Sequence, residues 1–269
     1  MKKCKLAVMA WLSVCIVLFT SCGNSAGVSA GSTSEVKSTA VSESTEEEKQ
    51  PYEILREKED ETKQIAADED QQVIELKEAL NEFQFFYTEA DGAGDVLMGM
   101  SPHCDEAAEK GKSCILPFLY LFGPSVDPVM MLGFNYITDE YMDMDTVEID
   151  TDNYRYTRSV LEGEIQKTKV TINGGQINGG QTERLDEIAM HLVTEDDLDA
   201  LVDIVESDEV GLTFAKYNTA KPVFVECEMP EEDRQAITDV LNAYYLYLNA
   251  SEKVRAKAIA DISYTEVES

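Results

Sequence analysis

The chain has 269 residues, 43% of them hydrophobic, which is enough apolar material for a sizeable core. Its formal net charge is −31, because 53 aspartates and glutamates outnumber 22 lysines and arginines. This charge repels nucleic-acid phosphates and anionic lipid headgroups, so we exclude both as surface-bound partners. Cations and basic peptides remain possible ligands, and the charge also favours solubility.

The N-terminus has the pattern of a signal peptide. Lys2, Lys3 and Lys5 are followed by an almost wholly apolar segment at residues 6–20. As a helix this segment is about 22 Å long, whereas the hydrocarbon core of a bilayer is ~30 Å thick. It is therefore too short for a membrane anchor, and we interpret residues 1–21 as a leader that is removed.

Cys22 directly follows the apolar segment. The sequence Phe19-Thr20-Ser21-Cys22 resembles the lipobox of bacterial lipoproteins, with Phe19 where leucine is commoner. The resemblance implies cleavage before Cys22 and attachment of lipid to its thiol. It also implies a protein that is held on the cell membrane by its lipid and faces outside the cytoplasm. A small-residue pattern at 28–30 lies too far from the apolar segment for ordinary secretory cleavage.

Three segments follow the leader. Residues 22–50 comprise Cys22 and a linker of Ser, Thr, Gly, Ala and Glu, which we expect to be disordered because it has too little apolar surface to bury. Residues 51–70 have the composition of a charged helix that leads into the fold. Residues 71–269 carry the periodic apolar patterns of a folded domain.

The first part of this domain mixes a helical pattern with strand patterns. Apolar residues at intervals of three and four predict a helix over residues 73–87, which ADGAG at 90–94 ends. Pro102 and Gly111 suggest the start and the end of a second helix. Apolar runs and alternating patterns predict strands at 115–122, 129–137, 147–156 and 167–172. The duplicated sequence INGGQINGGQ at 172–181 favours a long hairpin loop.

The C-terminal part has the order strand, helix, strand, strand, helix. A strand at 185–193 precedes a helix whose start, Thr194 with Asp197, has the spacing of a capping box. Alternating residues at 210–214 and 223–227 predict a hairpin, and Pro230 opens the last helix. The predicted fold class is therefore α+β, with an antiparallel sheet and helices packed on one face.

The cysteines and histidines leave several alternatives open. Outside the cytoplasm, Cys104 and Cys114 are a possible disulfide, while Cys227 fits a small buried residue in a strand. His103 with these cysteines, and with His191 as a further ligand, is an alternative metal set, but its spacing matches no known zinc pattern. A cysteine nucleophile with His191 as its base is a further alternative.

Seven acidic residues fall within residues 139–152 and suggest calcium binding. However, DMDTVEIDTDN lacks the glycine and the closing glutamate of an EF-hand loop. In so acidic a chain some clustering of carboxylates is expected by chance. Cation binding therefore remains possible but is not assigned to particular ligands.

The sequence predicts no catalytic residue, no metal site and no cofactor. We expect a non-catalytic lipoprotein that binds an unknown protein, peptide or small molecule, or assists assembly of the cell envelope. The long linker favours this hypothesis, because reach helps a binding protein more than it helps most enzymes. An envelope hydrolase with an unrecognised active site, and a cation sensor, are the alternatives.

Replacement of Cys22 by serine tests the lipid anchor. Because serine offers no thiol for lipid attachment, we expect Cys22→Ser to release the protein from the membrane fraction or to block removal of the leader. Cell fractionation and the mass of the mature protein measure both outcomes. A variant that stays membrane-bound and is processed normally would contradict the prediction.

Overall fold

A computed structural model describes residues 50–52, 69–90, 94–104, 106–173 and 181–266. The leader, Cys22, nearly all of the linker and most of the predicted lead-in helix lie outside the described residues. So does the centre of the duplicated INGGQ segment, at 174–180. Within the described residues no helix is both long and apolar enough to cross a membrane.

The described residues form two compact units. The described residues of unit 1 fall within Met1–Pro102, Phe118–Met130 and Thr238–Ser269, and those of unit 2 within His103–Pro117 and Met131–Ile237. Three of the boundaries fall inside regular elements rather than in loops. No change in composition marks them, which is why the sequence analysis treats residues 71–269 as one domain.

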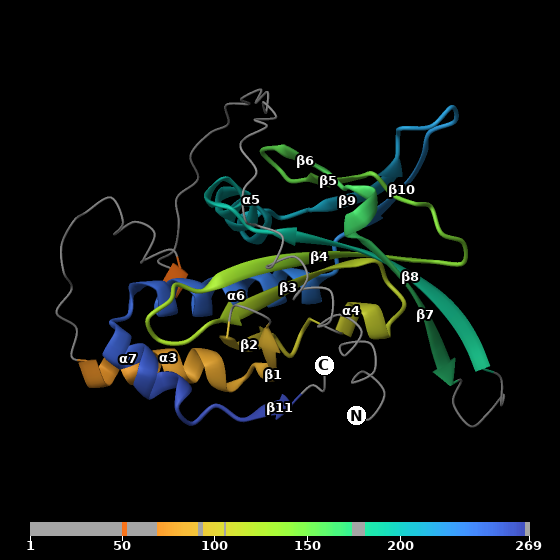
Figure 1. The fold of residues 1–269 in the computed structure, drawn as a ribbon. Coiled ribbons are helices and arrows are strands. Elements are labelled where there is room, and N and C mark those ends of the chain that lie inside the picture. Colours follow the sequence, from red (N-terminus) through yellow and green to blue (C-terminus); the bar gives the residue numbers. More distant parts are fainter. Residues whose placement is uncertain (1–49, 53–68, 91–93, 105, 174–180, 267–269) are drawn as a thin grey trace. The chain divides into compact units, whose positions relative to one another are not determined.

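The strands form two sheets, whose hydrogen-bonded orders are β11-β1-β2-β3-β4-β8-β7 and β10-β9-β5-β6 (Figure 1). In the described residues β1 pairs with β11 in parallel, whereas β1–β2, β2–β3, β4–β8, β7–β8, β5–β6, β5–β9 and β9–β10 are antiparallel. The predicted α+β class with antiparallel pairing and packed helices is confirmed, and there are two sheets instead of one.

Unit 1 contains two helices that lie side by side and a set of aromatic-rich strands. Its elements are α3 (Glu69–Asn81), β1 (Gln84–Ala90), β2 (Gly94–Met100), α7 (Glu252–Ile259) and β11 (Tyr264–Glu266). The helix predicted over 73–87 is wrong in its second half, because α3 ends at Asn81. The residues that follow, QFFYTEA, are rich in aromatic and β-favouring side chains and pair with β2.

Two strands and one helix contribute to both units. They are β3 (Cys114–Leu121), β4 (Val129–Thr138) and α6 (Glu231–Asn249). All eight residues of β3 are buried, as the continuous apolar run predicts for a strand with both faces covered. The long helix predicted after Pro230 is α6, which begins directly after this proline, and the short helix α7 follows it.

Unit 2 holds the smaller sheet and most of the chain's long strands. Its complete elements are α4 (Glu106–Glu109), β5 (Thr146–Asp150), β6 (Arg155–Ser159), η1 (Glu162–Glu164), β7 (Ile165–Asn173), β8 (Gln181–Leu192), α5 (Glu195–Glu206), β9 (Gly211–Lys216) and β10 (Val223–Glu228). Strands β7 and β8 pair up to Asn173 opposite Gln181, so a hairpin encloses the INGGQ duplication.

Two predicted helix signals in unit 2 are found in the structure. Thr194 and Asp197 form the capping box at the start of α5: the Asp197 side chain accepts from the Thr194 backbone N–H at 2.8 Å. Gly111 has a φ of +73°, a conformation that glycine adopts readily, and it follows the short helix α4. The predicted helix from Pro102 is wrong in its length, since α4 begins only at Glu106.

Candidate functional site

The smaller sheet of unit 2 has one covered face. Its other face, which we call the solvent face, is exposed at β10 and partly exposed at β5, whereas Thr213 and Ala215 of β9 are buried. Residues that lie directly opposite one another in antiparallel strands share a face, so the register assigns each side chain. Val147, Ile149, Leu212 and Phe214 point to the covered face and are buried. The side chains of Glu148 and Asp150 belong to the other face.

Strand β10 is the edge of this sheet and is exposed on both sides. Phe224 is 56% exposed, Val223 52% and Val225 37%. Val225 lies directly opposite Phe214 on the same face of the sheet, and Phe214 is fully buried whereas Val225 is exposed. The covered face of the sheet therefore extends to β9 and does not include β10. Tyr217, in the connection between β9 and β10, is also exposed. One hairpin therefore presents four large apolar side chains to solvent, and we call Tyr217 with 223–225 the hairpin patch.

Acidic side chains occupy the solvent face beside this patch. Glu226 of β10 shares a row with Glu148 of β5, across Thr213. The next row pairs Glu228 with Asp150, across Gly211. We call these four carboxylates the acidic rows. Among the described residues neither Glu226 nor Glu228 forms an ion pair, whereas Asp150 pairs with Arg155.

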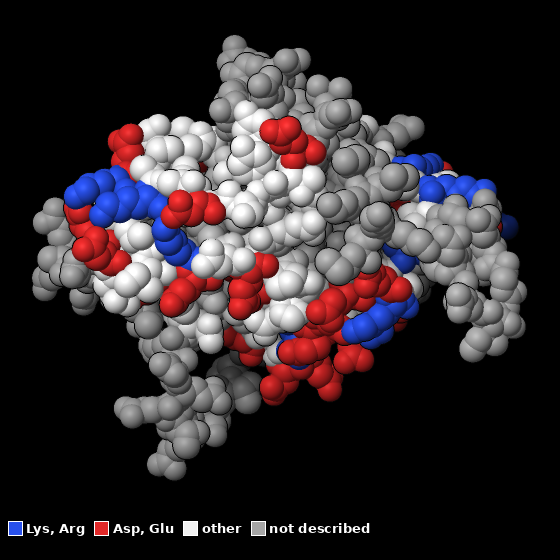
Figure 2. Space-filling model, turned by 90° about the horizontal axis from the view of Figure 1, so that it is seen from below, with Lys and Arg blue, Asp and Glu red and all other residues white. Residues whose placement is uncertain are grey.

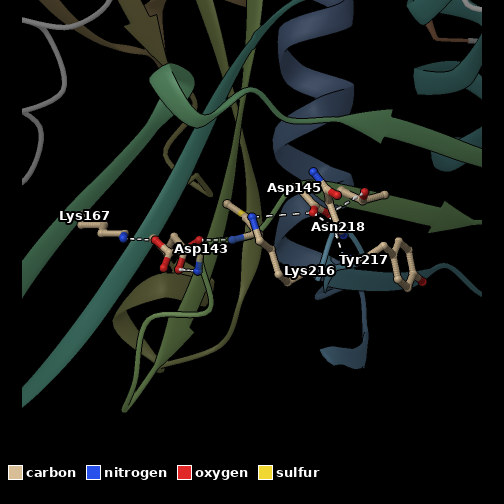
Figure 3. A network of polar contacts seen from close by, with 9 residues as sticks. Asp143, Asp145, Lys167, Lys216, Tyr217 and Asn218 are labelled. Atoms are coloured by element: carbon tan, nitrogen blue, oxygen red, sulfur yellow. Dashed lines mark hydrogen bonds and ion pairs between the residues drawn. The ribbon is translucent and has the colours of Figure 1, made fainter. Parts of the chain in front are cut away.

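Asp145 fixes the start of the connection between β9 and β10 (Figure 3). Its carboxylate accepts the backbone N–H groups of Tyr217 at 2.9 Å and Asn218 at 2.7 Å, and the Lys216 ammonium lies 3.7 Å away. Burial alone raises the pKa of this carboxyl, but the two backbone donors, the Thr146 hydroxyl and the Lys216 ammonium together outweigh it, so the net shift is downward. Asp145 therefore stays ionised and holds Tyr217 in place.

A second carboxylate fixes the loop that carries Asp145. Glu187 of β8 is completely buried, and it accepts the backbone N–H groups of three consecutive residues: Met142 at 2.9 Å, Asp143 at 3.0 Å, and Met144. Asp143 has a φ of +58°, which turns the three donors toward one acceptor, and its side chain pairs with Lys167. A buried charge with three donors satisfies its hydrogen-bonding capacity and locks the loop.

Several of the acidic residues at 139–152 therefore have structural partners. Asp143 pairs with Lys167, Asp145 binds backbone N–H groups, and Asp152 accepts the backbone N–H of Asp208 at 2.8 Å. Among the described residues no group of three or more His, Cys, Asp or Glu side chains is arranged to hold a metal ion. The described residues at 139–152 therefore provide no set of ligands for the cation binding that the sequence suggested. Asp and Glu side chains gather on part of the surface that Figure 2 shows.

The cysteines of the predicted site lie in unit 2 as free thiols. Cys104 and Cys114 are buried, and the Sγ of Cys104 donates to the Pro117 carbonyl at 3.6 Å. No bond joins Cys104 and Cys114 in the structure, and the possible disulfide stays a prediction. Burial, together with nearby Asp233, raises the pKa of the Cys114 thiol well above its ordinary value and that of Cys227 to about 11.

Each histidine faces a carboxylate. The Nε2 of His191 lies 3.0 Å from Asp197, and its ring stacks near Phe134. The Nδ1 of His103 lies 3.0 Å from Glu106. His191 therefore contacts Asp197 and not a cysteine, so the described residues do not form the pair of a cysteine nucleophile with His191 as its base. The raised pKa values of Cys114 and Cys227 also keep these two thiols protonated at neutral pH.

Asp233, in the first turn of α6, is a buried carboxyl that sequence reasoning missed. One of its oxygens accepts the Ile115 backbone N–H at 2.6 Å, and the other has no hydrogen-bond partner. Burial raises the pKa of this carboxyl to about 8, against the lowering effect of the Ile115 donor. Asp233 is therefore largely protonated at neutral pH, whereas most carboxyl groups are ionised there.

Comparison with known proteins gives no match to a family model, to a curated protein or to a solved structure. Function must therefore be argued from the chain's own surfaces. The hairpin predicted from the alternating residues at 223–227 is present, but Val223 and Val225 are exposed and Cys227, expected to be buried, is partly exposed. The signal available in the sequence was the unbroken apolar run Val223-Phe224-Val225, which departs from the alternation of a half-buried strand.

Replacement of Glu187 by glutamine tests the loop anchor. The amide keeps one acceptor oxygen but turns N–H groups toward at least one of the three backbone donors. We expect Glu187→Gln to lower the free energy of unfolding by about 1–3 kcal/mol, the cost of a buried unsatisfied donor. Urea unfolding measures it, with the exposed Glu140→Gln as a control that changes the same charge. Equal unfolding midpoints for the two variants would contradict the anchoring role.

Replacement of Asp233 by asparagine tests its raised pKa. Between the ordinary carboxyl pKa of ~3.9 and the folded value of about 8, the folded state keeps a proton that the unfolded state releases. Stability contributed by this group is therefore full below the lower value and falls as pH rises, by up to ~1.4 kcal/mol per pH unit. Asp233→Asn keeps an acceptor for Ile115 but cannot ionise, so its stability should fall less steeply between pH 5 and pH 7.5. Identical slopes for both proteins would show that Asp233 titrates normally.

Proposed function

We propose that this chain is a lipid-anchored, extracytoplasmic lipoprotein of the cell membrane whose folded part is a non-catalytic binding module. In this proposal the hairpin patch is the surface that contacts a polypeptide partner. The linker after Cys22 gives the module reach from the membrane. A partner protein of the envelope is then within range of the tethered domain.

The observation that carries the proposal is the exposure of the hairpin patch on a fixed hairpin. Apolar side chains that remain in water forgo the free energy of burial, which for a Val or Phe side chain is roughly 1.5–3 kcal/mol. Contiguous exposed apolar surface marks interaction sites more often than scattered exposed residues do. Here Val223 and Val225 lie on one face of the edge strand β10, and Phe224 lies between them on the other face.

The fixation of the hairpin supports binding rather than an incidental exposure. Asp145 accepts two backbone N–H groups where the hairpin connection begins, and Glu187 holds the loop from which Asp145 extends. A surface that is already ordered loses little conformational entropy when a partner docks. The raised pKa values of the Cys114 and Cys227 thiols support a non-catalytic role for these two cysteines, because the thiolate is the nucleophilic form.

Site-specific photocrosslinking in intact cells tests the proposal. A photoreactive amino acid at position 224 of the full-length, anchored protein should form an adduct with another polypeptide. The matched control is position 161, because Leu161 is equally a large exposed side chain, at 65% exposure, and lies outside the hairpin. Adducts at neither position, or the same adducts at both, would contradict binding through the hairpin patch.

A further inference from the structure

We infer that strand β10 accepts an extended segment of a partner as an added strand, and that this segment alternates basic and apolar side chains. The inference rests on the proposed function, since it names the partner class of the hairpin patch. It starts from the position of β10: in the described part of the chain its pairing is with β9 alone. An edge strand turns a row of N–H and C=O groups outward, and these can pair with another strand.

The side chains of β10 differ between its two faces. On the face of the sheet where Phe214 of β9 lies, β10 presents the exposed side chains of Val223 and Val225. On the opposite face of the sheet, β10 presents Phe224, Glu226 and Glu228, which follow one another at every second position and are all exposed. An added strand places alternate side chains on the two faces, because the side-chain period of a strand is two.

The partner's chemistry follows from this division. Side chains that fall beside Val223 and Val225 gain most by being apolar, because they bury those exposed groups. Side chains that fall beside Glu226 and Glu228 gain most by being cationic, because neither carboxylate has an ion-pair partner within the described residues. Glu148 lies in the same row as Glu226 and adds a carboxylate on this face, whereas Asp150, in the row of Glu228, is paired with Arg155.

Other occupants of the edge are disfavoured by charge. A second copy of this chain brings a further net charge of −31 and the same acidic rows. The chain's own linker is no better suited, since residues 43–48 are ESTEEE. A basic extended segment is the occupant whose charge complements the edge. A one-residue slip would place its basic side chains over the valines, so the register is fixed by the side chains themselves.

Three synthetic peptides test the inference with purified full-length protein in detergent. They are eight-residue segments in which valine alternates with lysine, with glutamine or with glutamate. We expect the lysine peptide to bind at least tenfold more tightly than the glutamine peptide, and the glutamate peptide not to bind. The affinity of the lysine peptide should fall with added salt, because exposed charge pairs are screened. Fluorescence anisotropy of labelled peptides gives the dissociation constants.

Variants locate the contacts. The double change Glu226→Gln with Glu228→Gln should weaken binding of the lysine peptide about three- to tenfold and leave the glutamine peptide unaffected. The matched control is Glu78→Gln with Glu82→Gln, two exposed glutamates of unit 1, which removes the same charge and should change nothing. Equal effects of the two double variants would overturn the assignment to the acidic rows.

Backbone methylation of the peptide tests strand addition separately. An added strand directs the N–H groups of every other residue to β10, so N-methyl groups on one alternate set should abolish binding while those on the other set leave it intact. Loss with both sets, or with neither, would overturn strand addition. If a crosslink forms at position 224 but all three peptides fail to bind, the inference is wrong and the proposed function stands. If no crosslink forms there, the proposed function itself fails.

Discussion

The arrangement of unit 2 depends on carboxylates that bind backbone amides. Glu187 is buried without any exposed surface, and three successive backbone donors compensate the cost of removing its charge from water. This contact sets the path of the loop between β4 and β5. Asp145 lies at the end of that loop and in turn holds the backbone of Tyr217 and Asn218. Two acidic side chains thus connect strand β8 to the exposed hairpin of β9 and β10.

The high negative charge of the chain therefore serves two purposes. Some carboxylates, such as Glu187 and Asp145, are internal ligands for amide groups and organise the fold. Others, such as Glu226 and Glu228, lie on the surface beside exposed apolar residues and determine which partners are attractive. An acidic residue that accepts hydrogen bonds from several backbone N–H groups stabilises the fold, whereas an exposed acidic residue without such donors is available to bind a partner.

The sequence predicted the fold class and most elements, because the apolar periodicity of the long strands and of α5 and α6 is strong. It failed where local propensity changes within a continuous apolar pattern, as at Phe83 and Tyr87, where β1 follows the end of α3. The division into two units was not predictable, since its boundaries fall inside β3, β4 and α6. The two INGGQ copies predicted a hairpin, and the flanking strands pair as expected.

Little of the candidate site could be predicted from the sequence. Cys22 lies outside the described residues, and the pair Cys104 and Cys114 are buried free thiols in the structure. The exposure of Val223, Phe224 and Val225 depends on β10 being at the edge of a sheet, and strand order is not encoded in a local pattern. The role of Glu187 likewise depends on a loop that lies more than 40 residues earlier in the chain.

Amide hydrogen exchange of the purified protein tests most directly whether carboxylates preorganise this hairpin. The account predicts slow exchange for the amides of Met142, Asp143 and Met144 and for those of Tyr217 and Asn218, compared with the exposed residues Ala220 and Lys221 of the same connection. In the variant Asp145→Ala, the amides of Tyr217 and Asn218 should exchange as fast as those of Ala220 and Lys221, because their acceptor is removed. Exchange of all these amides at the rate of Ala220 and Lys221 would contradict the central claim.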